Sequence, residues 1–157
     1  MQSRSPRWMR LLAFVGCVAA CSAEDLPGNY YNVDVNGTEN SCTGDGSNYT
    51  GSYEYRLEVD VQDIQLSIGE DLWATGSADG CLLTYESLVW EEPIDDYLVK
   101  WQIQGSARVN TGGGSGCVED GDWEGTESFV ILVSEHPDIA AGCTYDLDVT
   151  GAWFQEI

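Results

Sequence analysis

Apolar and polar side chains alternate along most of this chain after residue 28, and this alternation constrains the fold more than any other feature. It is clearest between Tyr53 and Gln62, where odd-numbered residues are apolar or aromatic and even-numbered ones are polar or charged. Successive side chains of a β-strand point to opposite sides, so the pattern predicts strands with one buried face and one face in water. No stretch shows a convincing helical stripe. The chain is therefore predicted to be all β.

Turn residues divide the alternating pattern into eight expected strands, which cover residues 31–36, 53–61, 64–68, 72–78, 81–90, 97–109, 127–134 and 145–154. The parity of the apolar residues changes at Gln62-Asp63, which predicts a tight turn or a bulge there. Asp79-Gly80 is typical of a hairpin turn. The continuous apolar run from Phe129 to Val133 indicates burial on both faces or an apolar outer contact.

Eight strands joined mostly by short hairpins favour an up-and-down antiparallel β-barrel, with a two-sheet β-sandwich as the alternative. Periodicity does not say which face points inward, so a membrane-spanning barrel with an apolar outer face also stays open. Gly28-Asn29-Tyr30 resembles the Gly-x-Trp at the start of the first strand of lipocalins, with Tyr in place of Trp. The resemblance implies a barrel whose mouth holds a small ligand.

The first 20 residues have the three parts of a secretory signal peptide in the required order. A basic start with Arg4, Arg7 and Arg10 is followed by an apolar run from Leu11 to Ala20. That run is too short to span a bilayer. We therefore expect residues 1–20 to be a cleaved export signal.

Val18-Ala19-Ala20-Cys21 resembles the lipobox of bacterial lipoproteins, in which a small residue precedes a cysteine that is lipidated and becomes the first residue of the mature chain. The resemblance covers residues 1–21 only and implies lipid on Cys21 and a membrane-anchored envelope protein. Ser22 follows the cysteine, and a residue other than Asp at this position resembles the signal of lipoproteins that are sorted to the bacterial outer membrane. The resemblance implies a location at the periplasmic face of that membrane or at the cell surface. The alternatives are an ordinary cleaved signal peptide and a poorer lipobox match ending at Cys17.

Residues 21–28 are expected to form a lipidated tether, and residues 29–157 a single β domain. A tether of about seven residues reaches about 25 Å at most, so the domain must lie close to the membrane. With strands of alternating direction, the loops 37–51, 92–96 and 135–142 are expected to face away from the membrane. The loop 110–122 is expected to lie near it.

Four cysteines follow the leader, and in an exported protein they predict two disulfides. Alternating strand directions bring Cys42 and Cys143 to one end of the barrel, and Cys81 and Cys117 to the other. These are the two predicted pairs. The first bridge would join the first and last strands and so pin the seam of a closed barrel.

Signal cleavage leaves three basic residues against 27 acidic ones, a net charge of about −24. Such a charge excludes nucleic acid as a partner and attracts cations. It motivates an alternative function, an inhibitor or decoy for a cationic envelope-attacking protein such as a lysozyme. The leading expectation is a lipoprotein that binds a small ligand or a protein partner.

Catalysis is not expected, because the single histidine, His136, precedes Pro137 in an expected loop and no GxSxG motif occurs. His136 is interpreted as a surface residue. A carboxylate-based hydrolase stays open, since paired acidic residues suffice for glycoside hydrolysis.

Asp120-Gly121-Asp122-Trp123-Glu124-Gly125 resembles the opening of an EF-hand calcium loop, with oxygen ligands at alternate positions. The segment departs from an EF-hand loop at two positions. Glu124 replaces Asp or Asn at the fifth position, and Ile131 occupies the twelfth, where a bidentate Glu is needed. An acidic hairpin loop is the preferred interpretation. Weak Ca²⁺ binding through Asp120, Asp122 and Glu124 is the alternative, and no other cofactor is expected.

Six aromatic residues share the apolar parity of their strands and are the candidate binding residues for a small amphipathic ligand: Tyr53, Tyr55, Tyr97, Trp101, Tyr145 and Trp153. An eight-stranded barrel is just wide enough to hold one such ligand. The alternative is that these rings simply fill the core.

Overall fold

The computed structural model describes residues 28–42, 49–109 and 122–157, which form nine β-strands and the segments that join them. The strands are β1 (Asn29–Asn40), β2 (Thr50–Asp60), β3 (Asp63–Ile68), β4 (Asp71–Asp79), β5 (Leu82–Ser87), β6 (Trp90–Ile94), β7 (Tyr97–Val109), β8 (Trp123–Ser134) and β9 (Thr144–Glu156). None of these residues belongs to a helix long and apolar enough to cross a membrane.

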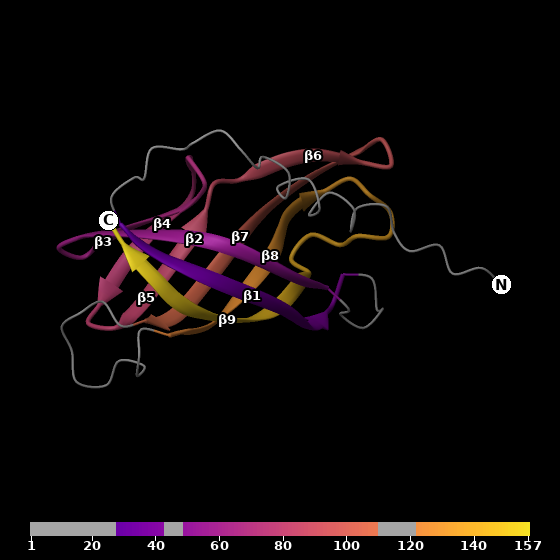
Figure 1. The fold of residues 1–157 in the computed structure, drawn as a ribbon. Coiled ribbons are helices and arrows are strands. Elements are labelled where there is room, and N and C mark those ends of the chain that lie inside the picture. Colours follow the sequence, from indigo (N-terminus) through magenta and orange to yellow (C-terminus); the bar gives the residue numbers. More distant parts are fainter. Residues whose placement is uncertain (1–27, 43–48, 110–121) are drawn as a thin grey trace.

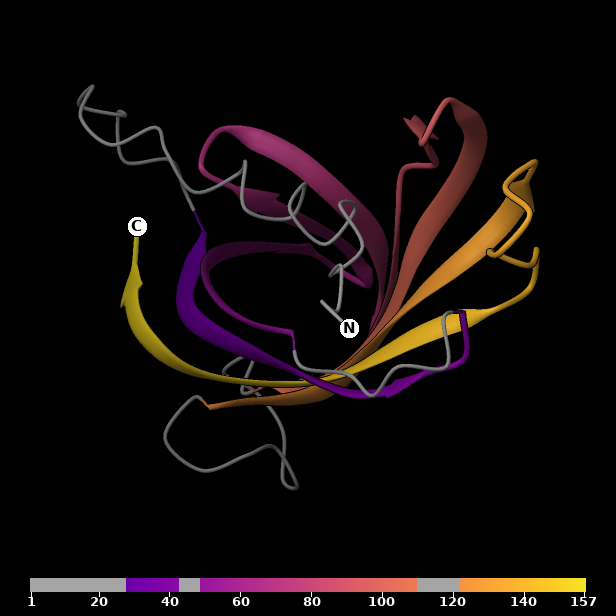
Figure 2. The ribbon, with the colours of Figure 1, turned by 90° about the vertical axis from the view of Figure 1, so that its right-hand side faces the viewer.

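Every strand pairs antiparallel with its neighbours, in the order β5-β4-β3-β2-β1-β9-β8-β7-β6 (Figure 1). Additional pairing of β5 with β7 closes eight of the strands into a barrel and leaves β6 as one extra strand. Figure 2 shows the strands arranged around a common axis, viewed toward the end where β6 and β7 meet. The predicted eight-stranded barrel is confirmed, and the sandwich alternative is wrong.

The extra strand arises because two short strands, β5 and β6, pair one after the other with the same edge of β7. Residues Tyr97 to Trp101 pair with β6, and residues Gln104 to Arg108 pair with β5. At the break between β5 and β6, the Ser87 hydroxyl accepts a hydrogen bond from the Ile103 backbone N–H at 2.8 Å. The side chain thus satisfies a donor that has no ladder partner there.

The prediction of one strand over residues 81–90 and a loop over 92–96 is therefore wrong. Pairing continues through Pro93 to Ile94, and only Asp95-Asp96 form the turn. Both turn residues have positive φ, 47° and 70°, as a two-residue type I′ hairpin requires. Two further strands are longer than predicted, since β1 runs on to Asn40 and β8 begins at Trp123.

The apolar face of the alternating pattern lies inside the barrel and fills the end near Gly28. The largest fully buried side chains there include Trp123, Tyr31, Leu57, Ile64, Leu66 and Leu83. Burying such a side chain contributes about 1.5–3 kcal/mol. At this end Gly28 exchanges two backbone hydrogen bonds with Ile157, at 3.0 and 3.1 Å. The alternating apolar residues therefore form a core and not an outer, lipid-facing surface.

On β8, burial on both faces of the apolar run is not observed. Leu132 and Val133 are 40% and 45% exposed, whereas Phe129 and Ile131 pack against buried clusters inside. The run therefore combines an inward face with an apolar outer surface.

The change of parity after β2 is a two-residue turn at Val61-Gln62, one residue earlier than predicted. Val61 has a φ of 59° and is 91% exposed, so it contributes nothing to the core. A positive φ is costly for a β-branched residue.

Replacing Val61 with glycine should raise the free energy of unfolding by about 1 kcal/mol, because glycine adopts this φ without steric strain. Urea denaturation would measure the change. Gln62→Gly is the matched control, since Gln62 has no positive φ and should lose stability. A lower stability of Val61→Gly would contradict the strain argument.

Candidate ligand-binding site

The end of the barrel opposite Gly28 is hollow and contains a cavity of about 520 Å³. Its walls are mostly apolar and come from the parts of the strands that lie nearest to Cys42 and Cys143. Eight aromatic side chains line it: Tyr49, Tyr53, Tyr55, Trp73, Trp90, Trp101, Phe129 and Tyr145. The barrel is therefore packed in one half and open in the other.

A layer of interlocked rings separates the two halves. Trp123 contacts Tyr55 and Tyr85, with ring centroids 5.7 and 6.1 Å apart, and Trp73 packs edge-on against Tyr85 at 5.8 Å. Gly105 makes room for this layer, because a Cβ atom there would lie 2.2 Å from the Tyr85 ring. Of these rings, Tyr55 and Trp73 line the cavity at its floor, and Tyr85 and Trp123 pack behind them.

Glu127 lies at this floor, although it is only 3% exposed. Its Oε1 accepts hydrogen bonds from the hydroxyls of Tyr85 at 2.8 Å and Tyr55 at 3.2 Å. Burial raises the pKa of the Glu127 carboxyl to about 7, and the two tyrosine hydrogen bonds partly oppose this shift. The carboxyl is thus poised to gain or lose a proton near neutral pH.

Both tyrosines remain hydroxyl donors over the same pH range. Burial, together with the neighbouring Glu127 carboxylate, raises the pKa of Tyr55 and of Tyr85 well above 10. Proton exchange at the floor near neutral pH is therefore confined to Glu127.

Stacked aromatic rings form one wall of the cavity. Trp90 and Trp101 stack with centroids 4.5 Å apart, Trp101 lies 5.2 Å from Phe129, and Phe129 lies 6.4 Å from Tyr145. The Tyr145 hydroxyl accepts a hydrogen bond from the Tyr49 backbone N–H at 3.1 Å. The wall is therefore held together by ring contacts and tied to the segment that precedes β2.

Four of the six predicted binding residues line the cavity, namely Tyr53, Tyr55, Trp101 and Tyr145. Tyr97 and Trp153 are not among its described lining residues, so the cavity does not support their assignment. Tyr97 is 42% exposed and packs on His136, while Trp153 is 43% exposed at the opposite end, where it donates to Asn29. Tyr97 on β7 and Trp153 on β9 each lie beyond the stretch of their strand that pairs with β8. Each therefore lacks β8 as a neighbour on one side.

The prediction missed Trp73, Trp90 and Phe129, and above all Glu127. On β8 the odd-numbered residues from Trp123 to Ile131 point inward, and Glu127 shares their parity. The sequence does contain a signal for Glu127: it is an acidic residue at a position where the alternating pattern of its strand places side chains inside the barrel.

No protein-family model, curated protein or solved structure matches this chain. The shape and chemistry of the cavity therefore carry the inference of function.

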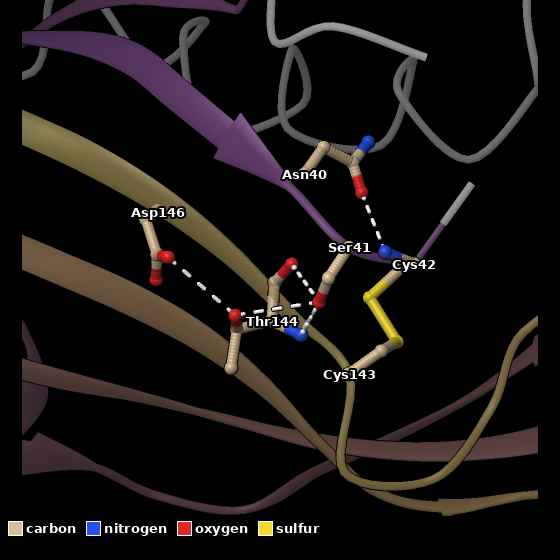
Figure 3. Close-up of a disulfide and its surroundings, with 6 residues drawn as sticks. All are labelled: Asn40, Ser41, Cys42, Cys143, Thr144 and Asp146. Carbon is tan, nitrogen blue, oxygen red and sulfur yellow. Dashed lines mark hydrogen bonds between the residues drawn. A yellow bond between two sulfur atoms is a disulfide. The ribbon is translucent and has the colours of Figure 1, made fainter. Parts of the chain in front are cut away.

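The predicted pairing of Cys42 with Cys143 is confirmed, with an S–S distance of 2.09 Å (Figure 3). The bridge follows the end of β1 and precedes β9, at the seam where these strands pair. Beside it, the Ser41 hydroxyl accepts the Thr144 N–H at 2.8 Å, and the Ser41 N–H donates to the Thr144 carbonyl at 2.9 Å. Cys117 lies outside the described residues, so its bridge to Cys81 stays a prediction.

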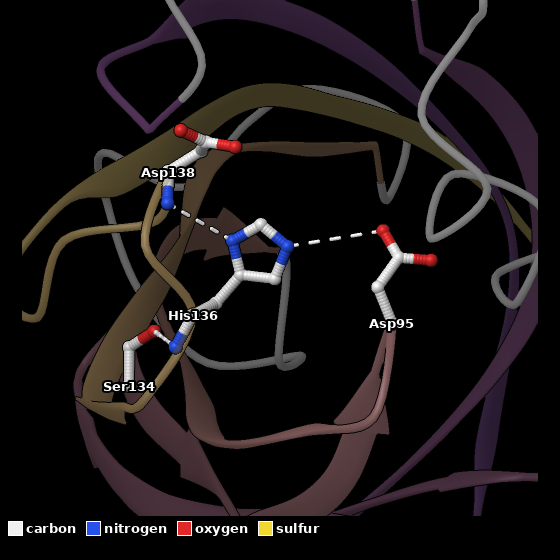
Figure 4. Close-up of polar contacts among 4 residues, drawn as sticks. All are labelled: Asp95, Ser134, His136 and Asp138. Atoms are coloured by element: carbon white, nitrogen blue, oxygen red, sulfur yellow. Dashed lines mark hydrogen bonds and ion pairs between the residues drawn. The ribbon is translucent and has the colours of Figure 1, made fainter.

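His136 is packed between neighbouring loops, and its side chain is only 11% exposed, so its interpretation as a surface residue is wrong. Its Nδ1 accepts the Asp138 backbone N–H at 3.1 Å, which leaves Nε2 facing Asp95 Oδ2 at 3.8 Å (Figure 4). The Ser134 hydroxyl accepts a bond from the His136 backbone and does not contact the ring. These contacts fasten the segment after β8 to the β6–β7 turn.

The suggested calcium ligands do not converge in the described part of the chain. Asp120 lies outside it, and from Trp123 onward the chain forms β8, with Trp123 buried and Glu124 exposed on the outer face. No group of three or more potential metal ligands occurs among the residues whose positions are described. Asp122 precedes β8, so the positions that would complete a calcium loop belong to a strand.

Proposed function

We propose that this protein is an outer-membrane lipoprotein, anchored through lipid on Cys21, whose barrel binds a small and largely apolar ligand. The cavity carries this proposal. Its volume of about 520 Å³ is within the range of small-molecule sites, which are typically concave, mainly apolar and supplied with a few polar groups. The floor around Glu127 supplies such a polar group.

The proposed anchor and the cavity fit together geometrically. The barrel begins at Gly28, about seven residues after Cys21, and the cavity lies at the other end of the strands. A short tether would therefore leave the mouth of the barrel facing away from the membrane. In this arrangement a ligand enters from the aqueous side.

Binding, and not catalysis, is proposed for the cavity. Its described lining contains no serine, threonine, lysine or histidine, and Cys42 is bound in a disulfide. The described lining therefore offers Glu127 no serine or threonine hydroxyl, free thiol or lysine amine to activate.

Native mass spectrometry of the protein extracted from the membranes of its own host tests both parts of the proposal. We expect the mass of a chain that begins at a lipidated Cys21, together with a non-covalently retained small molecule. Ile131→Trp should abolish retention because its larger side chain fills the cavity. Leu132→Trp, on the outer face of the same strand, should retain the molecule.

Two results would count against the proposal independently. A mature chain without lipid on Cys21 would overturn the anchor. A wild-type cavity that retains nothing and takes up no apolar compound in titrations would overturn the ligand-binding function.

A further inference from the structure

Glu127 has one carboxyl oxygen committed to protein contacts and one that is free for a ligand. Both tyrosine hydroxyls donate to Oε1. Oε2 accepts no hydrogen bond from the residues that the structure describes, although the carboxyl is buried and lines the cavity. A carboxyl oxygen that borders a mainly apolar cavity gains from a hydrogen bond, so Oε2 favours an incoming donor.

Among the described lining residues, the members of the acidic and basic side-chain classes are all acidic. They are Asp71, Glu92 and Glu127. The basic side chains of the described strands lie elsewhere: Arg56 contacts Glu58 at 2.6 Å, Lys100 contacts Glu91 at 2.7 Å, and Arg108 is exposed on β7. An anionic ligand would meet repulsion in this cavity, whereas a cation would meet attraction.

The aromatic wall also suits a cation. Trp90, Trp101 and Phe129 present their rings to the cavity above Glu127, and indole faces are the best cation–π acceptors among side chains. The same rings bind the apolar part of a ligand through buried area. Charge recognition and apolar contact are thus available in one site.

From these three observations we infer that the cavity takes a hydrophobic amine, whose ammonium group donates to Glu127 Oε2 while its apolar part lies along the aromatic wall. The inference rests on the proposed ligand-binding function and specifies its ligand class. A bound ammonium favours the ionised carboxylate, so it would also compensate for the burial that raises the pKa of Glu127.

The test uses three probes that share a ten-carbon chain: decylamine, decanol and decanoate. Each is titrated below its micelle concentration into the purified mature protein, and tryptophan fluorescence is followed, since Trp90 and Trp101 line the cavity. Decylamine should bind at least about tenfold more tightly than decanol, the difference expected for a hydrogen bond to a charged group, and decanoate most weakly. Decanol should compete with decylamine for the same site.

Two controls separate the cavity from the acidic surface. The titrations are repeated in 0.5 M NaCl, where the attraction of exposed charges is screened and the preference for the amine should persist. Glu127→Gln should lower the affinity for decylamine at least about tenfold and change the affinity for decanol less than about threefold. Glu54→Gln, an exposed residue on the outer face of β2, should bind all three probes as the wild type does.

The outcomes distinguish the two proposals. Decanol or decanoate binding as tightly as decylamine would overturn the amine inference and leave the ligand-binding function standing. An amine preference that survives in Glu127→Gln would overturn the assignment of Glu127. No binding of any probe would overturn both. The comparison of probes on the wild type decides the ligand class even if Glu127→Gln does not fold.

Discussion

Replacing both Cys42 and Cys143 with alanine should lower the free energy of unfolding by up to about 5 kcal/mol. The bridge closes a loop with a sequence separation of 101 residues, and the chain-entropy model assigns nearly this value to a loop of about 100 residues. A single domain has about 5–15 kcal/mol in total, so the loss would remove a large fraction of its stability. We expect a protein that is partly unfolded at 37 °C.

Urea denaturation of the wild type and of the double variant measures this loss, with the slope of the transition compared as well. Ser41→Ala is a matched control at the same seam, since it removes a hydroxyl that accepts the Thr144 N–H beside the bridge. It should cost only about 1 kcal/mol. A double variant that loses no more than Ser41→Ala would show that the hydrogen bonds between β1 and β9 close the barrel without help from the disulfide.

Glu127 should make the stability of the barrel fall as the pH rises from 5 to 8. In the unfolded chain its carboxyl has the ordinary pKa of 4.5, and in the folded chain about 7. Between these values the folded state binds more protons than the unfolded state, so the free energy of unfolding decreases with pH. The decrease due to this group should be about 2–3 kcal/mol over the range.

Glu127→Gln cannot ionise, and the difference between its unfolding curve and that of the wild type isolates the contribution of Glu127. The two free energies should diverge in favour of the variant as the pH rises, because glutamine remains neutral. Glu54→Gln, on the exposed outer face of β2, should follow the wild type at every pH. Parallel curves for Glu127→Gln and the wild type would mean that water or a ligand keeps the carboxyl charged in the folded state.

The closed barrel and its seam disulfide could be predicted from the sequence because both follow from the number of strands and their order along the chain. Period-two alternation defines strands, and alternating strand directions place Cys42 and Cys143 at the same end. The break between β5 and β6 could not be predicted, since Pro93 is typical of a loop. Pro93 is tolerated in β6 because, among the described strands, β6 pairs only with β7, so the missing N–H leaves no second ladder of theirs incomplete.

The cavity and its acid were harder to predict for a different reason. Alternation predicts that a side chain points inward, but not whether neighbouring rings fill the space. Here, Gly105 lets the Tyr85 ring lie over β7 and reach Glu127 and Trp123 of β8, beneath the floor of the cavity. The chain has 27 acidic residues, so the presence of Glu127 among them indicates nothing by itself. Only its position in the alternating pattern, which places its side chain inside the barrel, distinguishes it from the others.

The ring layer around Trp123 divides the barrel into two compartments with separate tasks. Below it, close packing of large side chains specifies the fold, whereas above it residues such as Leu72 and Leu88 line the cavity and are largely exposed. Changes in the upper compartment therefore face weaker constraints from folding than changes below. The same scaffold is suited to acquire new ligand preferences, by natural drift or by design, while its lower half stays unchanged.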